Sequence, residues 1–133
     1  MKNLLILWSL PKKIKDKTKY QNIIKACKPF FDEIYSPLDT VEFVWTDQER
    51  FDRALFLLKK CDFILWEQSI PSTWQWLEIG IAFWLNKPLL VIAEEWSQVS
   101  WLTLWLPILK EIYYYKSRKD LEKFLKNYFE KWK

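Results

Sequence analysis

The distribution of apolar residues along the chain predicts alternating strands and helices. Three short runs contain only apolar residues, at positions 4–8, 63–66 and 89–92. Uninterrupted runs of this length are typical of strands covered on both faces of a parallel sheet. The remaining strands are expected at 112–115 and at one of two places, 32–35 or 41–45.

The segments between these runs carry apolar residues at helical spacing. Two of them open with a capping box, Thr46 with Glu49 and Ser72 with Gln75, in which side chains satisfy free N–H groups at the helix start. The helix after Ser72 is apolar almost all round, and such a helix is expected to be buried. Helices are therefore expected at about 16–31, 46–60, 72–85, 99–109 (until Pro107) and 119–132.

Strands that alternate with helices of this length imply right-handed crossovers and a parallel sheet. We therefore expect an α/β fold, a flavodoxin- or Rossmann-like three-layer sandwich with a mostly parallel sheet of about five strands. No linker or internal repeat interrupts the pattern, so residues 1–133 are expected to form a single domain.

The composition excludes several classes of site. The 133 residues include one glycine, Gly80, two cysteines, Cys27 and Cys61, and no histidine. A single glycine cannot form a glycine-rich phosphate loop, and so few soft ligands argue against zinc or another transition metal. Without histidine, Ser-His-Asp and Cys-His triads are impossible. No metal or cofactor is expected.

The net charge is +4, and lysines concentrate at 12–18 and 116–133. Apolar residues recur at helical spacing within the second group, which favours a solvated helix face over binding to nucleic acid. No apolar run reaches the ~20 residues of a membrane-spanning helix.

The amino-terminal apolar run superficially resembles a signal peptide. It is short, however, and Pro11, Lys12 and Lys13 follow where small cleavage-site residues would stand, so a buried first strand is the better prediction. Two cysteines without a framework pattern indicate reduced thiols and a cytoplasmic location.

Ligands of such folds bind at the carboxyl ends of the strands. Ser9 follows the first strand, Glu67, Gln68 and Ser69 follow the strand at 63–66, and Glu94 and Glu95 follow the strand at 89–92. Tryptophans also gather near these ends, at Trp8, Trp66, Trp74 and Trp76. They are expected to pack in the core or pocket wall, or to stack on a nucleobase.

Glu78 lies in an otherwise apolar helix, so its carboxylate must be paired, protonated or functional. Both a structural and a catalytic role fit the sequence. Ser72 likewise fits two compatible roles, since a serine at a helix start caps the helix and can hold an anion at its positive end.

The sequence from Cys61 to Ser72, with Leu77–Ala82 and Asn86-Lys87-Pro88, resembles the nucleoside 2-deoxyribosyltransferase family. The branch it is most similar to is the 2'-deoxynucleoside 5'-monophosphate N-glycosidases. The resemblance implies that Glu78 is the nucleophile that attacks C1' of the sugar, and that water or another base resolves the glycosyl-enzyme.

The same resemblance implies the binding residues. Ser72 and Ser9 would hold the 5'-phosphate, and Lys12 or Lys13 would replace an arginine of the family. Trp8 is a further candidate for substrate binding because of its position at the end of the first strand, not because of the resemblance. Ser100 would correspond to a serine contributed by a neighbouring subunit, which implies a homodimer.

The chain departs from the family pattern at three places. The second carboxylate of the family falls on Ala54, and a tyrosine of the first strand falls on Leu5. Asp52 is the candidate for a relocated acid, although two residues along a helix turn a side chain by roughly 200°. Trp74 and Trp76 replace glycines of the loop where sugar and phosphate would sit.

Two functional hypotheses follow. The first is an N-glycosidase or deoxyribosyltransferase acting on a small deoxynucleoside or 5'-monophosphate. The second is a catalytically lapsed member that binds a nucleotide-like ligand or a protein partner. A variant of the first, based on fold analogy, is a sensor that cleaves NAD with a lone glutamate.

Overall fold

The computed structural model describes residues 3–9, 17–40, 45–70 and 72–132. These residues form a five-stranded sheet in the order β2-β1-β3-β4-β5, in which every neighbouring pair is parallel. The strands are β1 (Asn3–Trp8), β2 (Glu33–Tyr35), β3 (Phe63–Glu67), β4 (Leu89–Glu94) and β5 (Leu109–Tyr115).

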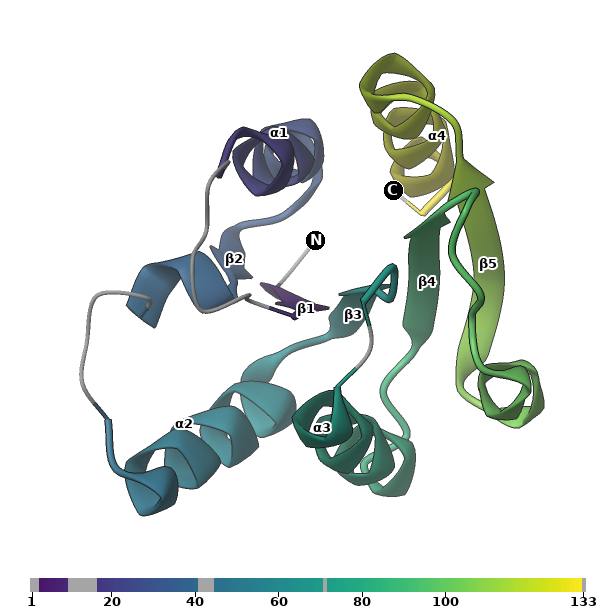
Figure 1. Cartoon of the computed structure of the whole chain (residues 1–133). Helices are drawn as coiled ribbons and strands as arrows, with labels where there is room; N and C mark the ends of the chain where they lie inside the picture. Colours follow the sequence, from purple (N-terminus) through teal and green to yellow (C-terminus); the bar gives the residue numbers. More distant parts are fainter. Residues whose placement is uncertain (1–2, 10–16, 41–44, 71, 133) are drawn as a thin grey trace.

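Helices cover both faces of the sheet (Figure 1). Helices α1 (Thr18–Cys27) and α4 (Arg118–Glu130) lie on one face, and α2 (Asp47–Lys60) and α3 (Thr73–Trp84) lie on the other. Short 3-10 helices form η1 (Lys28–Phe30), η2 (Pro37–Thr40) and η3 (Trp101–Trp105). The predicted three-layer α/β fold is confirmed, and its strand order is that of flavodoxin-like proteins.

The alternation of side chains along the strands divides the core in two. Leu4, Ile6 and Trp8 of β1 pack in the cluster with α1 and α4. Leu5 and Leu7 pack in the cluster that includes α2 and α3. The central strands β1, β3 and β4 therefore bury side chains on both faces of the sheet. For this reason their sequences contain continuous apolar runs rather than alternating apolar and polar residues.

The two predicted capping boxes differ. At Thr46 both bonds form: the Glu49 N–H donates to Thr46 Oγ1 and the Thr46 N–H donates to Glu49 Oε1. Ser72 caps α3 by accepting a bond from the Gln75 N–H at 3.4 Å. The Gln75 side chain is engaged elsewhere, because its Oε1 accepts a bond from the Trp66 indole at 3.0 Å.

Three local predictions are corrected or resolved. The segment 32–35 supplies β2, while 41–44 lies outside the described residues. The expected helix at 99–109 is wrong: only η3 forms there, and β5 begins at Leu109 rather than at 112, beyond Pro107. Pro107 cannot continue a helix, which leaves too few residues before it for a stable α-helix.

Helix α3 is also less buried than predicted. Leu77, Phe83 and Trp84 are 46%, 45% and 86% exposed. An outer helix of a three-layer sandwich packs only one of its sides against the sheet. The apolar residues on the other side of α3 are therefore exposed.

Candidate functional site

The strand order reverses between β1 and β3, and this switch point is where doubly wound folds hold ligands. The carboxyl ends of the two strands meet there, with Trp8 opposite Glu67 in the parallel register. Helix α1 follows β1 in sequence, and α3 follows β3. The start of α3, with its N-cap Ser72, therefore belongs to this edge of the sheet, and Glu78 lies midway along the same helix.

Glu78 lies on the side of α3 that faces the sheet, together with buried Gln75, Ile79 and Ala82. The residue is only 9% exposed, and burial raises the pKa of its carboxyl from 4.5 to about 8. Burial is the cause of this shift, and it favours the neutral acid at pH 7. The prediction from sequence that Glu78 is a buried carboxyl is confirmed.

Two glutamine amides near this edge have unused donors. Gln68 and Gln75 are 0% and 2% exposed, and the Nε2 atom of each has no hydrogen-bond partner in the described part of the chain. The oxygen of each amide is engaged, with the Thr103 hydroxyl donating to Gln68 and the Trp66 indole donating to Gln75. Buried donors are normally paired, so these two are candidate groups for an acceptor atom of a ligand or water.

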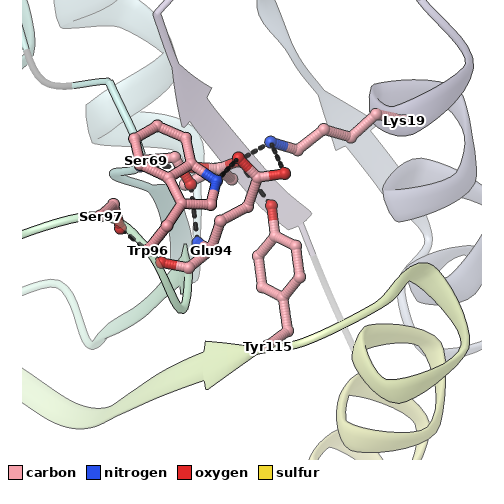
Figure 2. Close-up of polar contacts among 7 residues, drawn as sticks. Lys19, Ser69, Glu94, Trp96, Ser97 and Tyr115 are labelled. Atoms are coloured by element: carbon pink, nitrogen blue, oxygen red, sulfur yellow. Dashed lines mark hydrogen bonds and ion pairs between the residues drawn. The ribbon is translucent and has the colours of Figure 1, made fainter.

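On the opposite face of the sheet, the carboxylate of Glu67 is held by three groups, two of which belong to the side chains of Lys19 and Tyr115 that Figure 2 shows. It is 2% exposed, and it accepts bonds from the Ser69 N–H at 2.6 Å and the Tyr115 hydroxyl at 2.9 Å. The Lys19 ammonium lies 2.6 Å from the same carboxylate and 3.6 Å from that of Glu94. A buried carboxylate with this many partners is satisfied, and the network joins β3, β5 and α1.

The network also fixes the protonation of its tyrosine. Burial, and then the Glu67 charge, raise the pKa of Tyr115 far above its ordinary value, so the hydroxyl stays a donor. Sequence reasoning placed Glu67 at a strand end but missed Lys19 and Tyr115, because they are distant in sequence and carry no motif.

A cavity of about 500 Å³ opens beside this network, between α1 and α4. Lys19, Glu94, Trp96, Tyr115 and Arg118 are among its lining residues. A second cavity of about 440 Å³ lies along the same two helices. Neither cavity is lined by Glu78 or Ser72.

The other residues predicted from sequence are spread over the molecule. Trp8 is 4% exposed and stacks on Tyr20 with ring centroids 4.4 Å apart, so it packs in the core on the α1 side. Ser9 is half-buried directly after β1, and Lys12 lies outside the described residues. Ser100 caps η3 by accepting a bond from the Leu102 N–H at 3.3 Å.

The candidate acid Asp52 lies on α2, and Trp74 and Trp76, at positions expected to correspond to loop glycines, lie in the first turns of α3. Asp52 is exposed on α2, and its carboxylate accepts a bond from the Gln48 side chain one turn earlier. Ala54 is half-buried on the same helix. Trp76 packs edge-on against Trp66 with centroids 5.1 Å apart, whereas Trp74 is 40% exposed.

The two cysteines are poorly placed for nucleophilic chemistry. Cys27 and Cys61 are buried and free, and burial raises the pKa of both thiols, which disfavours a reactive thiolate.

Within the described ranges, no cluster of three or more acidic or cysteine side chains is arranged to hold a metal ion. No helix in the described part of the chain is both long and apolar enough to cross a membrane.

Comparisons with known proteins identify the fold but not the family. No family model and no curated protein matches the sequence. Among solved structures, the CMP N-glycosidase BcmB of Clostridium botulinum is similar, with a TM-score of 0.72 and 16% sequence identity. The match covers 95% of this chain and 99% of that chain. The chain therefore shares the fold of that protein over almost its whole length.

Proposed function

We propose that the protein is an N-glycosidase that acts on a small nucleotide, a nucleoside 5'-monophosphate, through Glu78. The observation that carries this proposal is the buried Glu78 carboxyl on the helix that starts at the carboxyl edge of the switch-point strands. The structural similarity to an enzyme named for CMP supports the same class of substrate.

The proposed reaction is a displacement at C1' of the sugar. The ionised Glu78 carboxylate forms a bond to C1' while the bond from C1' to the base nitrogen breaks, and the leaving base takes up a proton from solvent. Water then attacks C1' and returns a proton to solvent as the C1'–Glu78 bond breaks, which releases the free sugar phosphate and regenerates the carboxylate. Transfer of the sugar to another base instead of water would make the same site a deoxyribosyltransferase.

The binding groups of the proposal lie around the start of α3. Glu78 follows Ser72 by six positions, a rise of about 9 Å along the helix. Ser72 and the first N–H groups of α3 would bind the phosphate at the positive end of the helix. Ser9 and Lys12 would contribute from the segment after β1, and the free amide donors of Gln68 and Gln75 would bind acceptor atoms of the ligand.

We expect the purified protein to release free base from at least one member of a panel of ribo- and deoxynucleoside 5'-monophosphates, the parent nucleosides and NAD. Glu78→Gln should lower the rate by about 10³-fold or more, because an amide cannot form the glycosyl bond. Base release is followed by chromatography. Asp52→Asn, assayed in parallel, tests Asp52 as the second carboxylate.

The pH dependence of this activity separates two roles of Glu78. A nucleophile must be ionised, so kcat/KM should rise with pH through about 8, the pKa of the buried carboxyl. A rate that falls over the same interval would instead make Glu78 a proton donor. If the wild-type protein is folded and binds nucleotide but releases no base from any substrate, the enzymatic proposal is wrong.

Ser72→Ala should have two separable effects. Loss of the N-cap lowers the free energy of unfolding by about 1 kcal/mol. If Ser72 holds phosphate, kcat/KM for a 5'-monophosphate should also fall about tenfold relative to the parent nucleoside. Ser117→Ala is the matched control, because Ser117 caps α4 in the same way, accepting a bond from the Asp120 N–H at 3.2 Å. An equal loss with both substrates in Ser72→Ala would contradict the phosphate role.

A catalytically lapsed nucleotide-binding protein is the second candidate. It is favoured by the raised pKa of Glu78, which burial causes and which keeps the carboxyl neutral at pH 7. It is favoured also by the position of Asp52, whose carboxylate is exposed and bonded within α2. Calorimetric binding of a 5'-monophosphate without base release, in wild type and Glu78→Gln alike, would support this candidate.

A further inference from the structure

Gln75 is a buried amide of α3 whose orientation is fixed by a neighbouring side chain. The residue is 2% exposed, and its Oε1 atom accepts a bond from the Trp66 indole at 3.0 Å. An indole nitrogen donates but cannot accept, so the amide must present its oxygen to Trp66. The NH₂ group is thereby left for another acceptor, and its Nε2 atom has none in the described part of the chain.

The second buried amide, that of Gln68, is less constrained. Its Oε1 atom accepts a bond from the Thr103 hydroxyl at 3.1 Å. A hydroxyl both donates and accepts, so the Gln68 amide can turn round and donate to Thr103 instead. Of these two amides, Gln75 is therefore the one whose NH₂ group requires an acceptor from elsewhere.

Helix geometry brings the carboxyl of Glu78 within reach of this NH₂ group. Gln75 and Glu78 are both buried on the side of α3 that faces the sheet, three positions apart. Side chains at this spacing are neighbours on a helix, with about 5–6 Å between their Cβ atoms, and a glutamine can pair with a carboxylate there. Helical side chains also lean toward the N-terminus, so that of Glu78 leans toward the turn that contains Gln75.

The described part of the chain offers an ionised Glu78 no cation. Burial is the one cause of its raised pKa, with no contribution from a charge or a hydrogen bond. Glu67 of β3 and Glu94 of β4 lie on the opposite face of the sheet, where both contact the same lysine of α1. Beyond the end of α3, Lys87 donates to two backbone oxygens, and Arg53 of α2 lies over an aromatic ring. The other charged residues of α2, and those of β5, are exposed. The free NH₂ group of Gln75 is therefore the group best placed to stabilise the carboxylate.

We infer that Gln75 is the positioning residue of Glu78: its NH₂ group donates to the ionised carboxylate and holds it in one orientation. The NH₂ group has two N–H bonds, so one remains for an acceptor atom of a ligand. A hydrogen bond to an ionised group is roughly twice as strong as one between neutral groups, and it favours the charged form of a buried acid. The bond itself does not depend on turnover, whereas its consequence for catalysis rests on the proposed function.

Nitrogen-15 NMR of the full chain observes the bond without altering Gln75. The side-chain NH₂ signals of Gln75 should shift as the pH is raised through about 8, where Glu78 ionises, and this shift should be absent in Glu78→Gln. The NH₂ signals of Gln68 are an internal control and should not follow the same titration. No shift at Gln75, or an equal shift at both amides, would overturn the inference.

A second measurement follows the carboxyl carbon of Glu78 by carbon-13 NMR. In Gln75→Met, which keeps the length of the side chain but removes the donor, the pKa of Glu78 should rise by about 1. Gln68→Met is the matched control, because it removes the other buried amide and should leave this pKa unchanged. Circular dichroism verifies that each variant is folded. An equal rise in both variants, or none in Gln75→Met, would contradict a bond from Gln75.

Both measurements use protein without nucleotide, so they separate this inference from the proposed function. In protein that releases base, the rise of kcat/KM with pH should move upward in Gln75→Met by as much as the pKa of Glu78 does. A profile that stays in place would overturn the positioning role. A protein that shows both NMR titrations but releases no base would contradict the proposed function and support the bond from Gln75 to Glu78.

Discussion

The free energy of unfolding is expected to fall by on the order of 4 kcal/mol between pH 4.5 and pH 8 because of Glu78 alone. In the folded state burial raises the pKa of this carboxyl to about 8, whereas the unfolded chain titrates near 4.5. Between these values the folded protein keeps a proton that the unfolded chain has released, so raising the pH favours unfolding. Below pH 4.5 both states are protonated and the stability is complete.

Urea denaturation of wild type and Glu78→Gln at pH 4.5 and pH 8.5 measures this effect. The glutamine variant has no proton to lose, so it should be the more stable protein at pH 8.5 and should show a much smaller pH dependence. Glu130→Gln removes the same charge from an exposed position at the end of α4 and should behave as wild type. Identical pH dependence in wild type and Glu78→Gln would mean that the carboxyl reaches water.

This result would bear directly on function. A carboxyl whose ionisation costs several kcal/mol is kept in place at the expense of stability, which is common at active sites. If a bound nucleotide lowers the free-energy cost of ionising Glu78, the pKa of this carboxyl should fall from about 8 toward 7. The same titration, repeated with a bound 5'-monophosphate, therefore links the stability of the protein to its ligand.

The sequence predicted the central part of the fold because burial on both faces leaves a direct pattern. Strands β1, β3 and β4 are buried except at Asn3 and Glu94, and their sequences contain apolar runs. The edge strand β5 is less regular, with exposed Lys110 and Glu111 near its start, so its first residues could not be recognised. Helix α3 was recognised from its cap, but its exposed side was not, because apolar composition does not say which side the sheet covers.

The candidate site was predictable only where it depends on local sequence. Glu78 and Ser72 belong to one helix, so their burial and capping followed from neighbouring residues. The network at Glu67 could not be predicted, since Tyr115 is 48 residues away in the chain and Lys19 belongs to another helix. Such contacts depend on sheet order and register, which local patterns do not contain.

Glu67→Ala is expected to destabilise the protein by about 3 kcal/mol. The substitution leaves the Tyr115 hydroxyl and the Ser69 N–H without the acceptor that they share, and each buried donor without a partner costs about 1–3 kcal/mol. Lys19 is 29% exposed and keeps Glu94 as a second partner, so water and Glu94 reduce its share of the loss. Urea denaturation at pH 7 measures the change.

Two further variants identify the source of this loss. Glu67→Gln preserves the size of the side chain and an acceptor oxygen, so it should lose less stability than Glu67→Ala. Tyr115→Phe removes a single bond and should cost about 1 kcal/mol. Glu33→Ala is the control, because Glu33 forms an exposed ion pair with Lys60 at 3.5 Å and should change stability far less. A loss in Glu67→Ala no larger than that in Glu33→Ala would show that β3, α1 and β5 are held together by apolar packing alone, and that the buried carboxylate at the switch point has another purpose.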